Sequence, residues 1–203
     1  VGDAGVIDAG MVELVEVLFA SRAIDIRFGA FVVLEALRLL AADPPRASVT
    51  AVATTQEEIG YTGGGARTSA YTLDPSVALV VDVTFATDAP GLEKKELGEH
   101  KLGGGPVLSR GSAAHPVVFE RLVAAAEREG IPYTIAAQGR YTATDADAIY
   151  LSRSGVATGL ISVPNRYMHS PNEVVSRSDL EQAARLIAAF VRELRTDTDF
   201  VPR

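Results

Sequence analysis

Cysteine is absent from the 203-residue sequence, and its absence excludes both disulfide bonds and thiolate metal sites. Histidine is scarce as well, because the chain contains only His100, His115 and His169. A metal ion bound to this chain would therefore be held by carboxylates together with one or more of these histidines.

Positive charge is also in short supply. Asp and Glu total 26 against 19 Lys and Arg, which gives a formal net charge of -7. Binding to nucleic acid depends on clustered Lys and Arg at the phosphates, and no such cluster stands out, so we expect no nucleic-acid partner. No apolar run has the length of a transmembrane helix and no signal-peptide pattern opens the chain. We therefore expect a cytoplasmic location and no membrane partner.

Strand and helix patterns alternate along a chain long enough for one domain with a sizeable core. Strands are predicted over residues 12–20, 48–55, 77–83, 132–137 and 156–163. Helices are predicted over residues 26–41, 66–73, 116–129 and 145–153, and from Ser178 onwards with a Ser178–Glu181 capping box. Residues 60–65 and 84–112 are predicted as loops. This alternation indicates an α/β fold of three layers, αβα, with a central and mostly parallel sheet.

Acidic and imidazole side chains lie where several of these apolar elements end. They are Asp25, the pair Glu57 and Glu58, Asp82, and His169. Sites in open α/β sheets form at the carboxyl ends of strands, and isolated carboxylates there are costly to bury unless they are paired or bound to metal. Carboxylates with one histidine suit Zn²⁺, Co²⁺ or Mn²⁺ better than Ca²⁺. Each residue alone fits a cap, a salt bridge or a structural histidine, so the hypothesis of a metal site depends on their joint occurrence.

The glycine runs and the other two histidines are weaker indications of function. The glycine runs 63–65 and 103–105 lack the Lys-Ser/Thr pair and the spacing of a phosphate-binding loop, so nucleotide binding is disfavoured. We interpret His115 as the cap of the helix that begins at Pro116, and His100 as part of a solvent-exposed loop.

Five segments together resemble metallopeptidase family forty-two. The most specific are TTQEEIGYTGGGA (54–66), similar to the family's TTQEEVGLRGA, and the RYMHSPNEV run at 166–174. That run lies within TDADAIYLSRSGVATGLISVPNRYMHSPNEVV (144–175), which is similar to the family's closing GTDA…IPxRYxHSPxE stretch. SRAIDIRFGAFVVLEAL (21–37), VDVTFATDAPG (81–91) and KLGGGPVLSRG (101–111) match further motifs in the family's order. The family comprises glutamyl and leucyl aminopeptidases that assemble into tetrahedral particles, and some relatives are labelled endoglucanases. The resemblance covers nearly the whole chain and implies a zinc-peptidase-like fold.

The resemblance implies a role for each candidate residue. Asp25 matches the carboxylate that bridges two divalent metal ions, Zn²⁺ or Co²⁺ with Mn²⁺ as an alternative. Glu58 and His169 match the remaining ligands of one ion, and Asp82 matches a ligand of the other. Glu57 matches the general base, which takes a proton from water and passes it to the leaving amine.

The sequence departs from the family pattern at three places. Ile26 replaces the second aspartate of the family's DDR, Phe85 replaces the histidine of its DVTH, and no histidine precedes Asp25. The opening VGD resembles a segment that closes an inserted β-rich domain. We therefore expect residues 1–203 to be a catalytic domain without its N-terminal segment and that insertion, with an uncovered apolar surface near the early strands.

The resulting hypothesis is an aminopeptidase that removes N-terminal residues from peptides and forms a homo-oligomer, often of twelve subunits. One alternative is a non-catalytic relative that keeps the fold as an assembly subunit. Another is a glycoside hydrolase, which needs two carboxylates roughly 5 to 9.5 Å apart across a sugar bond. The adjacent Glu57 and Glu58 do not suggest that layout.

Overall fold

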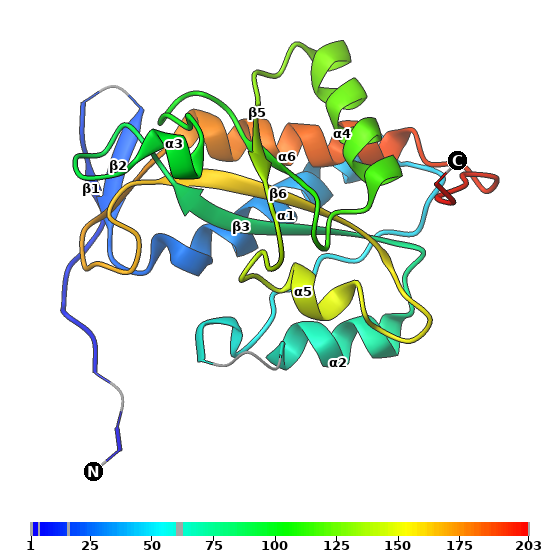
Figure 1. Cartoon of the computed structure of the whole chain (residues 1–203), viewed down its shortest axis with the longest axis horizontal. Coiled ribbons are helices and arrows are strands. Elements are labelled where there is room, and N and C mark those ends of the chain that lie inside the picture. Colours follow the sequence, from blue (N-terminus) through cyan, green and yellow to red (C-terminus); the bar gives the residue numbers. More distant parts are fainter. Residues whose placement is uncertain (1, 4, 16, 60–62, 203) are drawn as a thin grey trace.

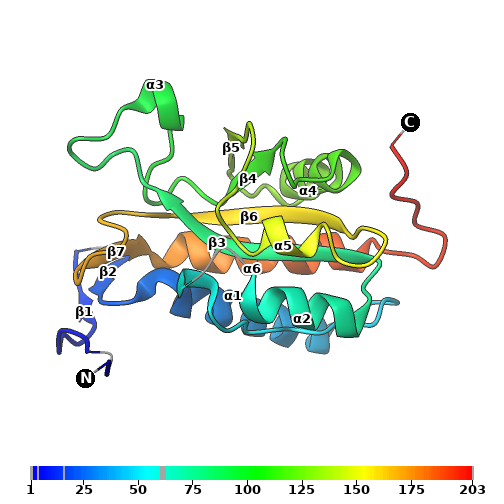
Figure 2. The ribbon, with the colours of Figure 1, turned by 60° about the horizontal axis from the view of Figure 1, so that its bottom comes forward.

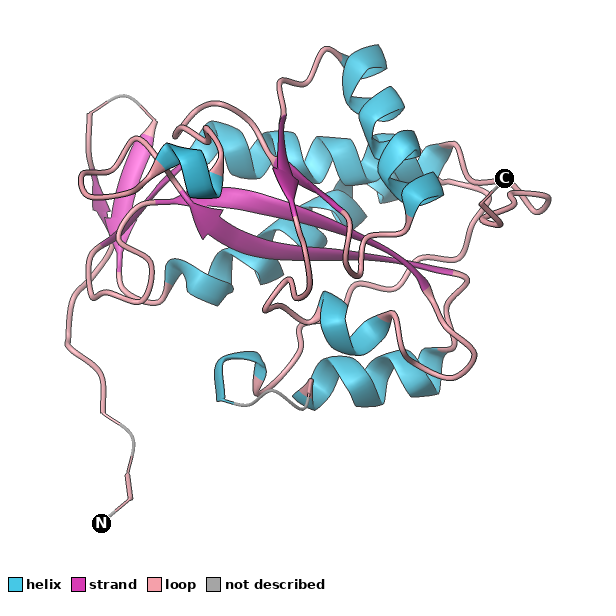
Figure 3. Ribbon diagram, in the orientation of Figure 1, coloured by secondary structure: helices cyan, strands magenta, loops and turns pink. Residues whose placement is uncertain are grey.

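The computed structural model describes residues 2–3, 5–15, 17–59 and 63–202 (Figure 1). Its strands are β1 (Val12–Glu13), β2 (Leu18–Ser21), β3 (Val77–Phe85), β4 (Val107–Arg110), β5 (Thr134–Ala137), β6 (Ala157–Asn165) and β7 (Glu173–Ser176). Its α-helices are α1 (Ile24–Ala42), α2 (Gly64–Leu73), α3 (Lys94–Leu97), α4 (Pro116–Glu129), α5 (Ala146–Ile149) and α6 (Arg177–Arg192), with a 3-10 turn η1 (Glu57–Ile59). Figure 3 colours these elements by type.

The central sheet has the strand order β3-β6-β4-β5. The pairs β3–β6 and β4–β5 are parallel, and β4–β6 is antiparallel. A smaller antiparallel sheet, β1-β2-β7, lies beside it. The prediction of an α/β fold with a mostly parallel sheet is therefore confirmed.

The two faces of the central sheet carry different helices, because alternate residues of a strand point to opposite sides. Val81, Val83, Ile161 and Val163 belong to the main core with α1, α4 and α6. Val80 and Leu160 belong to a smaller cluster with Ala146 of α5 on the other face. Figure 2 shows α1 and α6 running along the strands beneath the sheet, and α2 contacts α5. The sheet thus lies between two helical layers of unequal size.

Most of the predicted elements with a strong local pattern are present. The strands predicted at 77–83, 132–137 and 156–163 correspond to β3, β5 and β6, and the helices predicted at 26–41, 66–73 and 116–129 to α1, α2 and α4. The helix predicted at 145–153 is shorter, because α5 spans only Ala146–Ile149. The loop predicted at 60–65 lies partly outside the described residues, and α2 begins within it at Gly64.

Two strand predictions are wrong. Residues 12–20 form a hairpin of β1 and β2 rather than one strand, with Val12 opposite Ala20 and the N–H of Leu14 donating to the carbonyl of Leu18 at 2.9 Å. Residues 48–55, all of which are described, form no strand. A strand requires a neighbouring strand for its ladder of hydrogen bonds, and Val49 of this segment packs against the main core instead.

The loop predicted at 84–112 contains α3 and β4, so that prediction is also wrong. The N–H groups of Gly103 and Gly105 donate to Asp179 at 2.8 and 2.9 Å, which fixes the chain just before β4. His100 in this segment is 1% exposed, with Nδ1 2.7 Å from Thr134 Oγ1, rather than solvent-exposed as predicted. The glycines at 103–105 favoured the prediction of a loop, whereas pairing with β5 and β6 makes residues 107–110 a strand.

Helix ends agree with the sequence in part. His115 and Gly130 flank α4 as predicted, and Gly130 has φ 62°, which favours glycine. The proposed capping box of the last helix is wrong. α6 begins at Arg177, with Ser176 at the N-cap position. Within the described chain no side chain caps this helix, and the hydroxyls of Ser176 and Ser178 hydrogen-bond to each other at 2.7 Å instead.

Exposed apolar side chains gather in the N-terminal hairpin and the segment before it. They are Val6, Ile7, Met11, Val12, Leu14, Val15 and Val17. This agrees with the expected uncovered apolar surface near the early strands. Among the described helices, none is both long and apolar enough to cross a membrane.

Candidate metal centre

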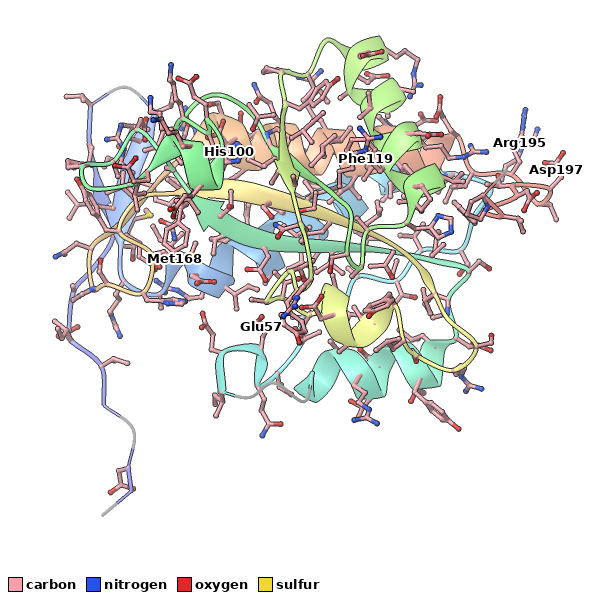
Figure 4. The ribbon with its side chains drawn as sticks, in the orientation of Figure 1. Glu57, His100, Phe119, Met168, Arg195 and Asp197 are labelled. Atoms are coloured by element: carbon pink, nitrogen blue, oxygen red, sulfur yellow. The ribbon has the colours of Figure 1, made fainter. Side chains whose placement is uncertain are left out.

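Asp25 lies at the start of α1, where the backbone has not yet become helical, with ψ 109° at Asp25. Its side chain is 5% exposed. The turn η1 carries Glu57 and Glu58 after an irregular segment, and Figure 4 labels Glu57 beside α5. Glu57 is half-buried, whereas the Glu58 side chain is 41% exposed.

His169 lies in the connection between β6 and β7, and its side chain lies beside those of Asp25 and Glu58. Its Nε2 is 3.2 Å from Asp25 Oδ2 and 3.4 Å from Glu58 Oε2. One ligand atom each from Asp25, Glu58 and His169 lies within 4.8 Å of the other two. Three residues that are far apart in sequence therefore converge on a space that a single cation would fit.

Asp82 lies near the carboxyl end of β3 and is 5% exposed. By strand alternation it shares a face with Val80, the face that carries α5. Asp82 is not one of the three residues that meet within 4.8 Å among the described residues. Its charge nevertheless acts on the cluster, since it helps to raise the pKa of Asp25. The structure thus brings three predicted ligands together and places the fourth close enough to interact.

The electrostatics of the site show an excess of negative charge. Burial first, and then the charges of Glu58 and Asp82, hold the pKa of Asp25 well above its usual range. Burial is also the main cause that raises the pKa of Asp82 to about 8. For Glu57, burial and the charges of Asp145 and Glu58 raise the pKa to about 7. In the described chain no Lys or Arg forms an ion pair with Asp25, Glu57, Glu58 or Asp82.

These properties fit a divalent cation. Crowded, desolvated carboxylates are stabilised when a cation balances them, and the set of carboxylate oxygens with one imidazole nitrogen suits Zn²⁺ or a similar transition metal. Asp25, Glu58 and His169 would hold one ion. Asp25 and Asp82 would contribute to a second. Glu57 is close enough to Glu58 and Asp82 for their charges to interact, and it is not needed as a ligand.

Comparison with known proteins identifies the family. The model of the M42 glutamyl aminopeptidase family matches residues 1–186. The chain belongs to this family. Among curated relatives, the lysyl aminopeptidase of Pyrococcus furiosus is 35% identical over 202 residues, which are 100% of this chain and 56% of the relative.

Solved structures agree with this assignment. The aminopeptidase APDkam598 of the archaeon Desulfurococcus kamchatkensis is 43% identical with a TM-score of 0.83, over 93% of this chain and 53% of that one. The Pyrococcus horikoshii TET1 peptidase, described as able to assemble into a tetrahedron or a large octahedral shell, is 30% identical with a TM-score of 0.72, over 87% and 51%. This M42 chain spans about half the length of the curated relatives it matches.

Two acidic residues beside the candidate centre had no role assigned from the sequence, although both lie within matched motifs. Asp145 is buried at the start of α5, accepts a hydrogen bond from Thr54 Oγ1 at 2.6 Å, and acts on Glu57 and Asp82 by its charge. Glu173 opens β7 and is 1% exposed. Their position inside the motifs was the available signal, but only the fold shows what they contact.

One surface pocket of the described chain has a volume of about 630 Å³, and none of the predicted site residues lines it. Its lining comes from the ends of α1 and α6 and from α4, and includes Arg46, Arg121, Arg192 and Arg195. Arg192 is already paired with Asp43 at 2.9 Å, so we assign this pocket no role.

Proposed function

We propose that this chain is the catalytic part of a metal-dependent aminopeptidase that removes N-terminal residues from peptides. The observation that carries the proposal is the meeting of Asp25, Glu58 and His169 within 4.8 Å, in a chain of the M42 family. Asp25, Glu58, Asp82 and His169 are the proposed ligands of two divalent ions, Zn²⁺ or Co²⁺ with Mn²⁺ as an alternative.

Glu57 is the proposed general base. Divalent ions, when bound, polarise the scissile carbonyl and ease the deprotonation of the attacking water. The Glu57 carboxylate takes a proton from that water while the oxygen of the water bonds to the carbonyl carbon. As the C–N bond breaks, Glu57 returns the proton to the leaving nitrogen, which departs as the amine. The residue's partial burial and its acidic neighbours favour this role, because both make the carboxylate a better proton acceptor.

The decisive experiment separates metal binding from proton transfer. Chelator treatment is expected to abolish release of the amino acid from aminoacyl-p-nitroanilides, and Co²⁺ or Zn²⁺ is expected to restore it. Glu57→Gln should retain metal, because Glu57 is not a proposed ligand, but lose roughly 10²–10⁴-fold in activity. An N-acetylated substrate, which has no free amine, is the matched control and should not be cleaved.

Two results would contradict the proposal. One is full activity in Glu57→Gln, and the other is activity that survives complete removal of metal. His169→Ala serves as the comparison variant, since it should lose metal and activity together. The different behaviour of the two variants is what assigns proton transfer to one residue and metal binding to the other.

We also propose that the protein forms a homo-oligomer, up to a dodecamer. Support comes from the assembly described for the Pyrococcus horikoshii relative and from the exposed apolar residues of the N-terminal segment. A cluster of exposed apolar side chains commonly marks a site of protein–protein contact. An enclosed assembly would admit peptides and exclude folded proteins.

A further inference from the structure

Glu173 has an unusual environment for a carboxylate. It is 1% exposed at the start of β7, and within the described chain it forms no ion pair with Lys or Arg. Burial of a charged group is costly unless hydrogen bonds compensate it. The partners of Glu173 therefore determine what the residue does.

Four N–H donors surround the Glu173 carboxylate. Oε2 accepts from the backbone N–H of Ile24 at 2.7 Å and of Asp25 at 3.3 Å. Oε1 accepts from the backbone N–H of His169 and from Asn165 Nδ2, both at 3.1 Å. An ionised carboxylate offers about four acceptor positions, so these donors use its capacity. Glu173 is thus left with no lone pair to serve as a metal ligand itself.

Two of the four donors belong to residues that we propose as ligands of the same ion. Asp25 lies 148 residues away from Glu173 in sequence, and His169 lies four residues away. One rigid group therefore fixes the start of α1 relative to the loop between β6 and β7. The side chains of the two residues then meet with Asp25 Oδ2 and His169 Nε2 3.2 Å apart.

On the basis of the proposed function, we propose that Glu173 is a positioning residue for the metal centre, whose carboxylate holds the backbones of Asp25 and His169 so that their side chains converge on one cation. Groups that orient metal ligands in this way typically change metal affinity 10–100-fold when they are altered. The amide of Gln has one oxygen and one NH₂ group. Glu173→Gln would therefore turn an NH₂ group toward two N–H donors, and the two hydrogen bonds from those donors would be lost.

The chain offers a matched control for a purely structural effect. Asp179 is 0% exposed and also accepts two backbone N–H bonds, from Gly103 and Gly105. Neither glycine is a proposed ligand. Asp179→Asn should cost folding stability to a similar degree while leaving metal affinity within a few-fold of the wild type.

The test is calorimetric titration of Co²⁺ and Zn²⁺ into metal-free wild type, Glu173→Gln and Asp179→Asn, together with urea unfolding of each without metal. The expected result is a 10–100-fold weaker affinity for Glu173→Gln alone. Wild-type affinity in Glu173→Gln, or equal weakening in Asp179→Asn, would overturn the inference and leave the proposed function standing. No metal binding by the wild type would overturn both the inference and the proposed function.

Should Glu173→Gln not fold, Asn165→Ala is the second variant, because it removes one donor to Oε1 of Glu173. Asn165→Ala must also weaken metal binding, and unchanged metal affinity in this variant would overturn the inference.

Discussion

Single residues in this protein show how the same chemical group takes opposite pKa shifts in different surroundings. At the candidate metal centre, carboxylates such as Asp82 are buried among other acids and their pKa values rise. Asp88 has a cationic partner instead. Arg166 Nε and Nη2 donate to its two oxygens at 2.9 and 2.8 Å, and the N–H of Leu102 donates at 3.2 Å. This pair joins the turn after β3 to the end of β6.

The Asp88–Arg166 pair leads to a prediction about pH. Burial alone would raise the pKa of Asp88, but the hydrogen bonds and charge of Arg166 outweigh burial and hold that pKa below its usual value. A depressed pKa stabilises the folded state above the unfolded pKa, near 3.9, and this stabilisation is lost as the pH falls through the folded pKa. Asp88→Asn should therefore remove about 1.5–3 kcal/mol of unfolding free energy at pH 7.

The measurement is urea unfolding of the wild type and Asp88→Asn between pH 7 and the acid transition. The difference in unfolding free energy should shrink as the pH is lowered into the acid range. A constant difference across this range would show that the pair's contribution does not depend on the ionisation of Asp88.

At the scale of elements, the contact between α4 and β6 depends on a residue without a side chain. A Cβ at Gly159 would lie 2.7 Å from Val118 Cγ1, and 3.1 Å from both Leu122 Cδ1 and Leu79 Cδ2. Real Cβ atoms essentially never approach another heavy atom to less than 3.0 Å, and contacts of 3.1 Å are also tighter than usual. The helix can pack against the strand here because position 159 is glycine.

Gly159→Ala is expected to destabilise the fold by about 1–3 kcal/mol, because the new methyl group forces α4 away from the sheet. Gly139→Ala is the control, since a Cβ at that position meets nothing within 4 Å. Denaturant unfolding of both variants measures the effect. Equal stability of the two variants would mean that α4 can shift without loss of packing.

At the scale of the whole molecule, the prediction concerns assembly. The exposed apolar side chains of the N-terminal hairpin and of the segment before it are the surface through which we expect the chains to associate. Light scattering of the purified protein should give a mass that is a fixed multiple of the chain mass. That multiple should not change with protein concentration, which distinguishes assembly from aggregation. A monomer at every concentration would contradict the homo-oligomer.

The sequence by itself determined the elements with strong local patterns, such as α1, α4 and β3, because periodic apolar residues and helix-end signals act between near neighbours. It also identified Asp25, Glu57, Glu58, Asp82 and His169 as candidates, through motifs that stand in the family's order. The metal and catalytic roles of these five residues stay predictions.

The tertiary structure alone decided the features that depend on partners far along the chain. β4 is a strand because β5 and β6 pair with it, whereas residues 48–55 have a strand-like sequence and form none. His100 is buried because the fold places Thr134 beside it. Glu173 joins Asp25 to His169 for the same reason, since hydrogen bonds between residues distant in sequence exist only once the chain has folded.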